Sequence, residues 1–329
     1  MFYLGIDVAK AKIDCCLILE NSESKKKTKT FSNMPKGFEQ LQTWLNHHAA
    51  NSTQTIILME ATSIYHERLA KYLFDAGYQV CVTNPARARY FAQSMSKLNK
   101  TDKADSEVLA RFAMTADLHF WQPLPEHIQL LNALLDRRAV LCEDLQREKN
   151  RLEKAESTFT IEPVLQSIHK SIKQLNKHIQ DIDQQIDDHI DQNPDLKNDK
   201  ELLSSIPAIA DRTSLLMLSF LRSHNFERAS QAAAFVGLVP IQRQSGSSIH
   251  GRSRLSKAGS SKIRAGLYMA AIVATRHNPH IKAMNERLLA NGKTKMMAIG
   301  AAMRKLVHLC YGVLKHQQPY QENYCINSQ

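Results

Sequence analysis

Short apolar runs separated by polar turns dominate the first 117 residues. The runs at 2–7, 12–19, 28–31, 55–59 and 78–82 have strand length and end at turn-forming or polar residues. They predict five β-strands. The first three runs follow one another closely along the chain, whereas longer segments separate the last two.

Those longer segments have the spacing of helices. Apolar residues recur every three or four positions over 38–45 and 65–76, and a further helix is predicted over 105–115. Three strands followed by helices alternating with strands are typical of an α/β domain with a mixed sheet. We therefore expect the first domain to occupy residues 1–117.

The pattern changes after Pro125. Leu and Ile residues recur at steps of three and four as far as about Pro194, and charged or Gln residues fill the other positions. This pattern predicts a helical coiled-coil segment over 118–195, either as an antiparallel hairpin or as a pairing surface between subunits. A helical bundle buried within one chain is the alternative.

Residues 196–329 are predicted to form a mainly α C-terminal domain with one Ser/Gly-rich loop, QSGSSIHGRSRLSKAGSSK. The apolar tract MMAIGAAMRKLVHLCYGVL contains Arg304, Lys305 and His308, so we expect a core helix and no membrane span. Asp7 interrupts the first apolar run, which argues against a signal peptide. Six cysteines without metal-binding spacing predict free thiols in a reducing cytosol.

The charge of the chain indicates which class of partner it binds. The formal net charge is +11, and no Asp or Glu occurs between Arg228 and Asn285, where nine Lys or Arg residues lie. A long stretch of one sign predicts a surface that faces phosphates, although a basic loop without function is the alternative. The candidate nucleic-acid contacts in this stretch are Arg243, Arg252, Arg254, Lys257, Lys262 and Arg264.

Four carboxylates are the candidate catalytic groups. Asp102 and Asp105 lie three positions apart in NKTDKADS, where helix capping would explain them if nothing else were present. Asp7 and Glu60, however, each end a predicted strand, and Gly5 beside Asp7 in GID is expected to let another group approach the backbone closely. Sites in open α/β sheets lie at strand ends. Phosphodiester chemistry with two Mg²⁺ ions requires several convergent carboxylates, because magnesium prefers oxygen ligands.

Lysines accompany these acids. Lys100 precedes the aspartate pair and Lys103 lies between its two members, and we expect both lysines to reduce repulsion between the acids and to attract a DNA phosphate. The motifs GIDVAK, MEATSIY and KTDKADS, in this order, resemble the RuvC-type domain of the DEDD recombinases. These are the insertion sequence 110 family of transposases, with the Piv-type DNA invertases as relatives. The resemblance continues through AAFVGLVPIQRQSGSSIHGRSRLSKAG near the C-terminus.

The resemblance implies an RNase H/RuvC-like fold for the first domain and a metal-binding tetrad of Asp7, Glu60, Asp102 and Asp105. It also implies that Ser245 is a nucleophile that forms a covalent phosphoserine–DNA intermediate. The implied cofactor is Mg²⁺, and the implied partners are donor and target DNA and a structured noncoding (bridge) RNA. A homodimer that assembles into a tetramer, in the bacterial cytoplasm and associated with the nucleoid, is expected on the same ground.

One departure from the family pattern concerns Ala208 and Ala210, which stand where the family has glycines in a segment resembling a helix-hairpin-helix.

Other functions also remain open. A Piv-like invertase would use the same residues, whereas a RuvC-like nuclease would use water and not Ser245. A sugar-kinase or actin-like ATPase would need glycine-rich phosphate contacts, which the chain lacks. A non-catalytic basic DNA organiser would not need Asp102.

Overall fold

The computed structural model forms two compact units, Met1–Pro123 and Leu124–Gln329. It describes residues 1–19, 26–95, 102–115, 117–159, 161–245 and 249–322, without the side chains of 102, 103 and 243–253. The three-domain division expected from the sequence stays a prediction.

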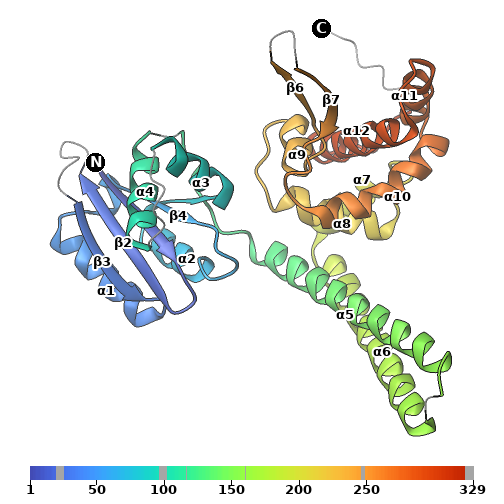
Figure 1. Ribbon diagram of the computed structural model, residues 1–329, viewed down its shortest axis with the longest axis horizontal. Helices are drawn as coiled ribbons and strands as arrows, with labels where there is room; N and C mark the ends of the chain where they lie inside the picture. The colour runs from blue at the N-terminus through green and yellow to red at the C-terminus, as the bar shows by residue number, and fades with distance from the viewer. Residues whose placement is uncertain (20–25, 96–101, 116, 160, 246–248, 323–329) are drawn as a thin grey trace. The chain divides into compact units, whose positions relative to one another are not determined.

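The first unit is built on a five-stranded mixed sheet (Figure 1). Its strands are β1 (Phe2–Val8), β2 (Lys12–Leu19), β3 (Lys26–Ser32), β4 (Thr55–Glu60) and β5 (Gln79–Thr83). The strand order is β3-β2-β1-β4-β5, in which β1, β2 and β3 are antiparallel and β1, β4 and β5 are parallel. The predicted mixed α/β sheet is confirmed.

Helices cover both faces of this sheet. On one face, α1 (Pro35–His47) and α2 (Glu67–Asp75) pack against the even-numbered residues of β1, such as Leu4. On the other face lie α3 (Pro85–Ser94) and α4 (Asp102–Thr115). Successive strand residues point to opposite faces, so both sides of β1 are apolar and buried. A short 3₁₀ helix, η1 (Ser52–Gln54), precedes β4.

The second unit is mainly helical. It contains α5 (Glu126–Glu156), α6 (Glu162–Gln192), α7 (Pro194–Ser204), α8 (Asp211–Arg222), α9 (Ala229–Phe235), α10 (Ser261–His277), α11 (Pro279–Ala290) and α12 (Lys295–His316), with strands β6 (Pro240–Ser245) and β7 (Ile249–Leu255). α12 is the one helix of the described residues that is long and apolar enough to cross a membrane. Half of its apolar window is buried, and Leu306, Val307 and Cys310 lie in the unit's core, as expected for a core helix.

α5 and α6 form a helical hairpin within the chain (Figure 1). The guanidinium of Arg138 donates to both carboxylate oxygens of Asp183, which joins the two helices. At one end of the hairpin, Leu131 and Ile190 enter the core of the helical unit. The expected pairing of two long helices is therefore satisfied within one chain.

One expectation for the second unit is wrong. The Ser/Gly-rich segment was expected to be a loop, but β6 and β7 pair there as an antiparallel hairpin in which Ser245 is the last residue of β6, opposite Ile249. The segment carries turn-forming Ser and Gly residues in place of the apolar alternation that signals a strand, so its sequence predicts a loop. A register shift between Ile241 and Arg243 adds a bulge to it.

Candidate active site

Helix α4 crosses strand β1 at Gly5 with almost no space between their backbones. A Cβ atom on Gly5 would lie 2.0 Å from the carbonyl oxygen of Ser106 and 2.3 Å from the amide nitrogen of Ala110. The close approach predicted for the glycine of GID is thus confirmed. Farther along α4, Leu109 and Phe112 pack with Tyr3 near the start of β1. The first turn of α4 therefore lies toward the carboxyl end of β1.

Asp7 and Glu60 occupy that end of the sheet. They directly follow Ile6 and Met59, which are partners in the parallel β1–β4 register. Strand side chains alternate between faces, so Asp7 shares the α4 side with Gly5, and Glu60 shares it with the core residues of β4 that contact α4. Both acids are half-buried. Two neighbouring strands thus present a carboxylate to the same side of the sheet.

Helix α4 contributes the other two predicted acids. It begins at Asp102, and Asp105, one turn later, immediately precedes the point of contact with Gly5. Residues three apart share one helix face, and Asp105 is half-buried. The side chains of Asp102 and Lys103 and the whole of Lys100 lie outside the described residues. Among the side chains that are described, no three Asp, Glu, His or Cys residues are close enough together to hold a metal ion.

Two further carboxylates on this side of the sheet were not singled out from the sequence. Asp14 lies directly opposite Asp7 in the β1–β2 register and is 5% exposed. It accepts a hydrogen bond from Thr30 and pairs with Lys12 at 3.0 Å. Its position inside the apolar run KIDCCLIL could have identified Asp14 from the sequence, because a carboxylate is rarely buried in a strand without a partner.

Glu107, on α4, is the second of these carboxylates. It is 7% exposed and pairs with Lys26 at 2.5 Å and with Arg111 at 3.0 Å. Cations therefore already balance Glu107 and Asp14. The predicted ligands described at this edge are Asp7, Glu60 and Asp105. They supply only oxygen atoms, which is the ligand chemistry of Mg²⁺ and not of a thiolate or imidazole site.

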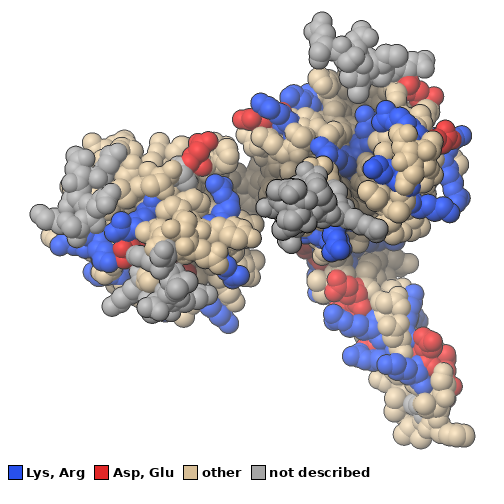
Figure 2. All heavy atoms as spheres, turned by 45° about the horizontal axis from the view of Figure 1, so that its top comes forward, with Lys and Arg blue, Asp and Glu red and all other residues tan. Residues whose placement is uncertain are grey.

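The basic residues predicted to bind nucleic acid differ in their surroundings. Arg254 and Lys257 are exposed, and Lys262 pairs with Asp136 at 2.8 Å. Arg264 donates to the carbonyl oxygens of Val236 and Gly259, so it also stabilises the end of α9. The side chains of Arg243 and Arg252, like that of Ser245, lie outside the described residues. Figure 2 shows several groups of Lys and Arg side chains on the visible face of the helical unit, with Asp and Glu side chains at its edges and along its projecting helical arm.

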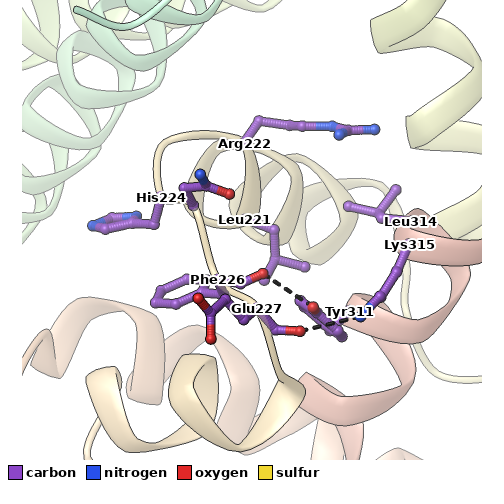
Figure 3. Close-up of a pocket in the computed structure, with 9 residues that line it drawn as sticks. Leu221, Arg222, His224, Phe226, Glu227, Tyr311, Leu314 and Lys315 are labelled. Carbon is purple, nitrogen blue, oxygen red and sulfur yellow. Dashed lines mark hydrogen bonds between the residues drawn. The ribbon is translucent and has the colours of Figure 1, made fainter. Parts of the chain in front are cut away.

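A cavity of about 250 Å³ lies in the second unit, and the polar groups around it bind to neighbouring parts of the same unit (Figure 3). The Tyr311 hydroxyl donates to the carbonyl oxygen of Phe226, and Lys315 Nζ donates to that of Glu227. Arg222, at its rim, forms a bidentate pair with the buried Asp199. Burial lowers the pKa of His224, which packs in an aromatic cluster beside this cavity. These polar groups stabilise the fold around the cavity.

The turn between α7 and α8 contains the two alanines that depart from the family pattern. Ala208 has a φ of +83°, in the left-handed region that favours glycine, whereas Ala210 precedes α8 with a φ of −88°. The backbone therefore keeps a glycine-like turn at 208 in spite of the side chain. Beside this turn is a cavity of about 430 Å³, to which Pro207, Met269 and Val273 contribute.

Known proteins resemble this chain along nearly its full length. The family model of the DEDD transposases of IS110 matches residues 4–158, and that of the Transposase IS116/IS110/IS902 family matches residues 200–286. The pilin gene-inverting proteins of Moraxella bovis and Moraxella lacunata are each 32% identical over 322 residues, which is 97% of this chain and 98% of theirs. An uncharacterized 43.6 kDa protein of insertion element IS110 from Streptomyces coelicolor is 25% identical over 121 residues, 36% of this chain and 30% of that protein. The chain therefore belongs to the IS110 family of transposases, which are DNA-recombining enzymes.

Proposed function

We propose that this enzyme cuts and rejoins DNA by using Mg²⁺, held by Asp7, Glu60, Asp102 and Asp105, together with Ser245 as nucleophile. The observation that carries the proposal is the crossing of α4 over Gly5, because it directs acids from β1, β4 and α4 to one edge of the sheet. We also assign an RNase H/RuvC-like fold to the first unit on the strength of its mixed sheet and family membership.

The acids suit this task. When bound, Mg²⁺ would polarise the scissile phosphate and stabilise the negative charge that develops on it. The protein's own part is to hold several carboxylates in place before DNA arrives, and the close packing at Gly5 restricts the first turn of α4. The nearby Asp14 and Glu107 have cationic partners and so add little repulsion to the site.

In the proposed reaction, Ser245 Oγ attacks the phosphorus atom of the scissile phosphodiester. A phosphorus–Oγ bond forms as the bond from phosphorus to the leaving deoxyribose oxygen breaks, and the serine proton passes to that leaving oxygen. The phosphodiester linkage is kept as a phosphoserine, so rejoining to another DNA hydroxyl requires no external energy source. Arg252 and Arg254 are the proposed cations that stabilise charge during this step.

The nucleic acids and the assembly belong to the same proposal. We infer that the donor and target DNA strands contact Lys100, Lys103 and the basic residues of the second unit, and that a noncoding RNA guides their choice. The two long helices, α5 and α6, would form a coiled coil that supports a homodimer and then a tetramer. The cytoplasm, at the nucleoid, is the proposed location.

DNA inversion is the second candidate outcome. The two Moraxella relatives that align along nearly the whole chain are named for inverting a pilin gene. The same residues would serve inversion and transposition, because both exchange phosphodiesters. A plasmid assay with the native flanking DNA separates the outcomes, since transposition moves a segment to a new site and inversion reverses it in place.

Trapping of a protein–DNA adduct tests the nucleophile. Wild-type enzyme denatured during reaction with labelled DNA is expected to yield a covalent adduct, and Ser245→Ala is expected to yield none. The matched controls are Ser247→Ala and Ser248→Ala, which should retain it. Normal recombination by Ser245→Ala would exclude serine attack and leave a nuclease-like reaction with water.

A further inference from the structure

The edge strand β3 and the end of helix α1 form a basic and aromatic surface on the first unit. Lys27 and Lys29 are exposed on β3 and point to the same side as Phe31, whose ring packs edge-on against Trp44 of α1 at 5.9 Å. The indole of Trp44 contacts the ring of His48 at 5.2 Å. We call the set Lys27, Lys29, Trp44, His47 and His48 the β3–α1 surface.

This surface lies on the opposite side of the sheet from the candidate active site. Phe31 belongs to the core that α1 and α2 cover, whereas Lys26, at an even-numbered position of β3, reaches the α4 side and pairs with Glu107. The alternation of strand side chains therefore divides the lysines of β3 between two roles. Lys26 balances a buried acid, and Lys27 and Lys29 face away from the active-site acids.

The positive charge of the β3–α1 surface is not balanced within the described part of the chain. No described carboxylate forms an ion pair with Lys27 or Lys29, and the ammonium of Lys29 lies 5.3 Å from the centre of the Phe31 ring. Burial lowers the pKa of His48, and His47, Lys27 and Lys29 lower it further. The positive charge of this surface therefore comes from Lys27 and Lys29, two neighbouring cations that favour an anionic partner.

Protection of a sheet edge is the simplest alternative explanation, because lysines on an edge strand discourage pairing with another chain. Edge protection requires charge on β3 alone. It does not account for two adjacent histidine rings, 5.2 Å apart, at the end of α1, or for an indole left half-exposed beside them.

We propose that the β3–α1 surface binds a single strand of DNA, as a second contact of the enzyme away from the active site. Residues i and i+2 of a strand lie roughly 6.6 Å apart, so Lys27 and Lys29 can each take one of two neighbouring phosphates. Trp44 offers an aromatic ring on which an unpaired base can stack, which favours a single strand over a duplex. The inference rests on the basic, aromatic surface and on family membership, and it does not depend on how the strand is cut.

Binding of the full-length protein to a fluorescein-labelled DNA strand, followed by anisotropy across a series of KCl concentrations, tests this inference. The double variant Lys27→Gln/Lys29→Gln is expected to bind roughly tenfold more weakly and to reduce the slope of log K against log salt by about 1.4, the value for two phosphate contacts on a single strand. The matched control is Arg68→Gln/Lys71→Gln, which removes the same charge from exposed positions of α2.

Equal losses in both double variants, or no loss in the first, would overturn the inference. Tighter binding of RNA than of DNA, weakened by the same substitutions, would overturn the assignment to DNA. Trp44 gives a local readout in a Trp121→Phe background, in which it is the single tryptophan. The DNA strand is expected to quench its emission, and unchanged emission at saturation would exclude a base on this surface.

Discussion

The Cα of Gly5 on β1 lies so close to Ser106 on α4 that a Cβ atom would be 2.0 Å from the Ser106 carbonyl oxygen. This contact fixes where the first turn of α4 begins relative to the sheet. It thereby determines whether Asp105 can act with Asp7 and Glu60.

Gly5→Ala is expected to destabilise the protein by about 3 kcal/mol, because the obstructing atoms are backbone atoms that cannot rotate away. Urea unfolding measures the loss. Gly312→Ala is the control: apart from its chain neighbours and the adjoining backbone of helix α12, no described atom lies within 4 Å of the added methyl group, so a gain of about 0.5–1 kcal/mol is expected. Equal stabilities of Gly5→Ala and wild type would mean that α4 does not press on β1.

Ala208→Gly is expected to stabilise the protein by roughly 0.5–1 kcal/mol. Ala208 has a φ of +83°, which costs an L-residue about 1–2 kcal/mol, and the added freedom of glycine in the unfolded chain offsets part of the gain. Ala265→Gly, at an exposed position of helix α10, should instead cost about 1 kcal/mol. A loss of stability for both variants would contradict the strained turn.

Arg222→Met is expected to destabilise the second unit by about 3 kcal/mol. Asp199 is 2% exposed and would lose its bidentate partner, and among the described side chains Gln317 would be left as its donor at 3.0 Å. Arg138→Met tests the same change where the partner, Asp183, is 44% exposed, and should cost at most about 1 kcal/mol. Chemical denaturation of both variants gives the comparison, and a similar cost for the two would show that burial of the carboxylate is not decisive.

Two buried thiols are expected to resist alkylation in the native protein. Burial raises the pKa of Cys81 and of Cys310 to about 12, so at pH 8 almost no reactive thiolate is present at either position. Cys142 is half-buried and should react before them. Iodoacetamide labelling followed by mass spectrometry reports the order. Rapid native labelling of Cys310 would show that α12 is not held in the core.

The sheet could be predicted from the sequence because its strands are short apolar runs bounded by turns, and Gly5 marked the close approach of another element. The five cysteines of the described residues are free thiols, as their spacing predicted. Asp14 was not predicted as part of the candidate active-site edge, because the role of a buried acid depends on its cross-strand neighbours. These are Asp7 and Thr30, and the strand register is needed to identify them.

The second unit illustrates a different limit. The β6–β7 hairpin is held by backbone pairing in a Ser/Gly-rich segment without regular apolar alternation, so hydrophobic periodicity carried no signal for it. The long helices were predictable from their spacing, but a single sequence cannot distinguish pairing within a chain from pairing between chains. Contacts such as Arg138–Asp183 decide that α5 pairs with α6 of the same chain.

The most direct test of the proposed metal site is a titration with Mn²⁺, a substitute for Mg²⁺ with similar oxygen ligands, followed by electron paramagnetic resonance. Wild-type protein is expected to bind Mn²⁺, and Glu60→Gln and Asp105→Asn are each expected to weaken that binding at least about tenfold, equivalent to 1.4 kcal/mol. Glu39→Gln, an exposed acid on α1, should leave it unchanged. Mn²⁺ binding by Glu60→Gln and Asp105→Asn that matched wild type would contradict a metal site at the joint edge of β1, β4 and α4.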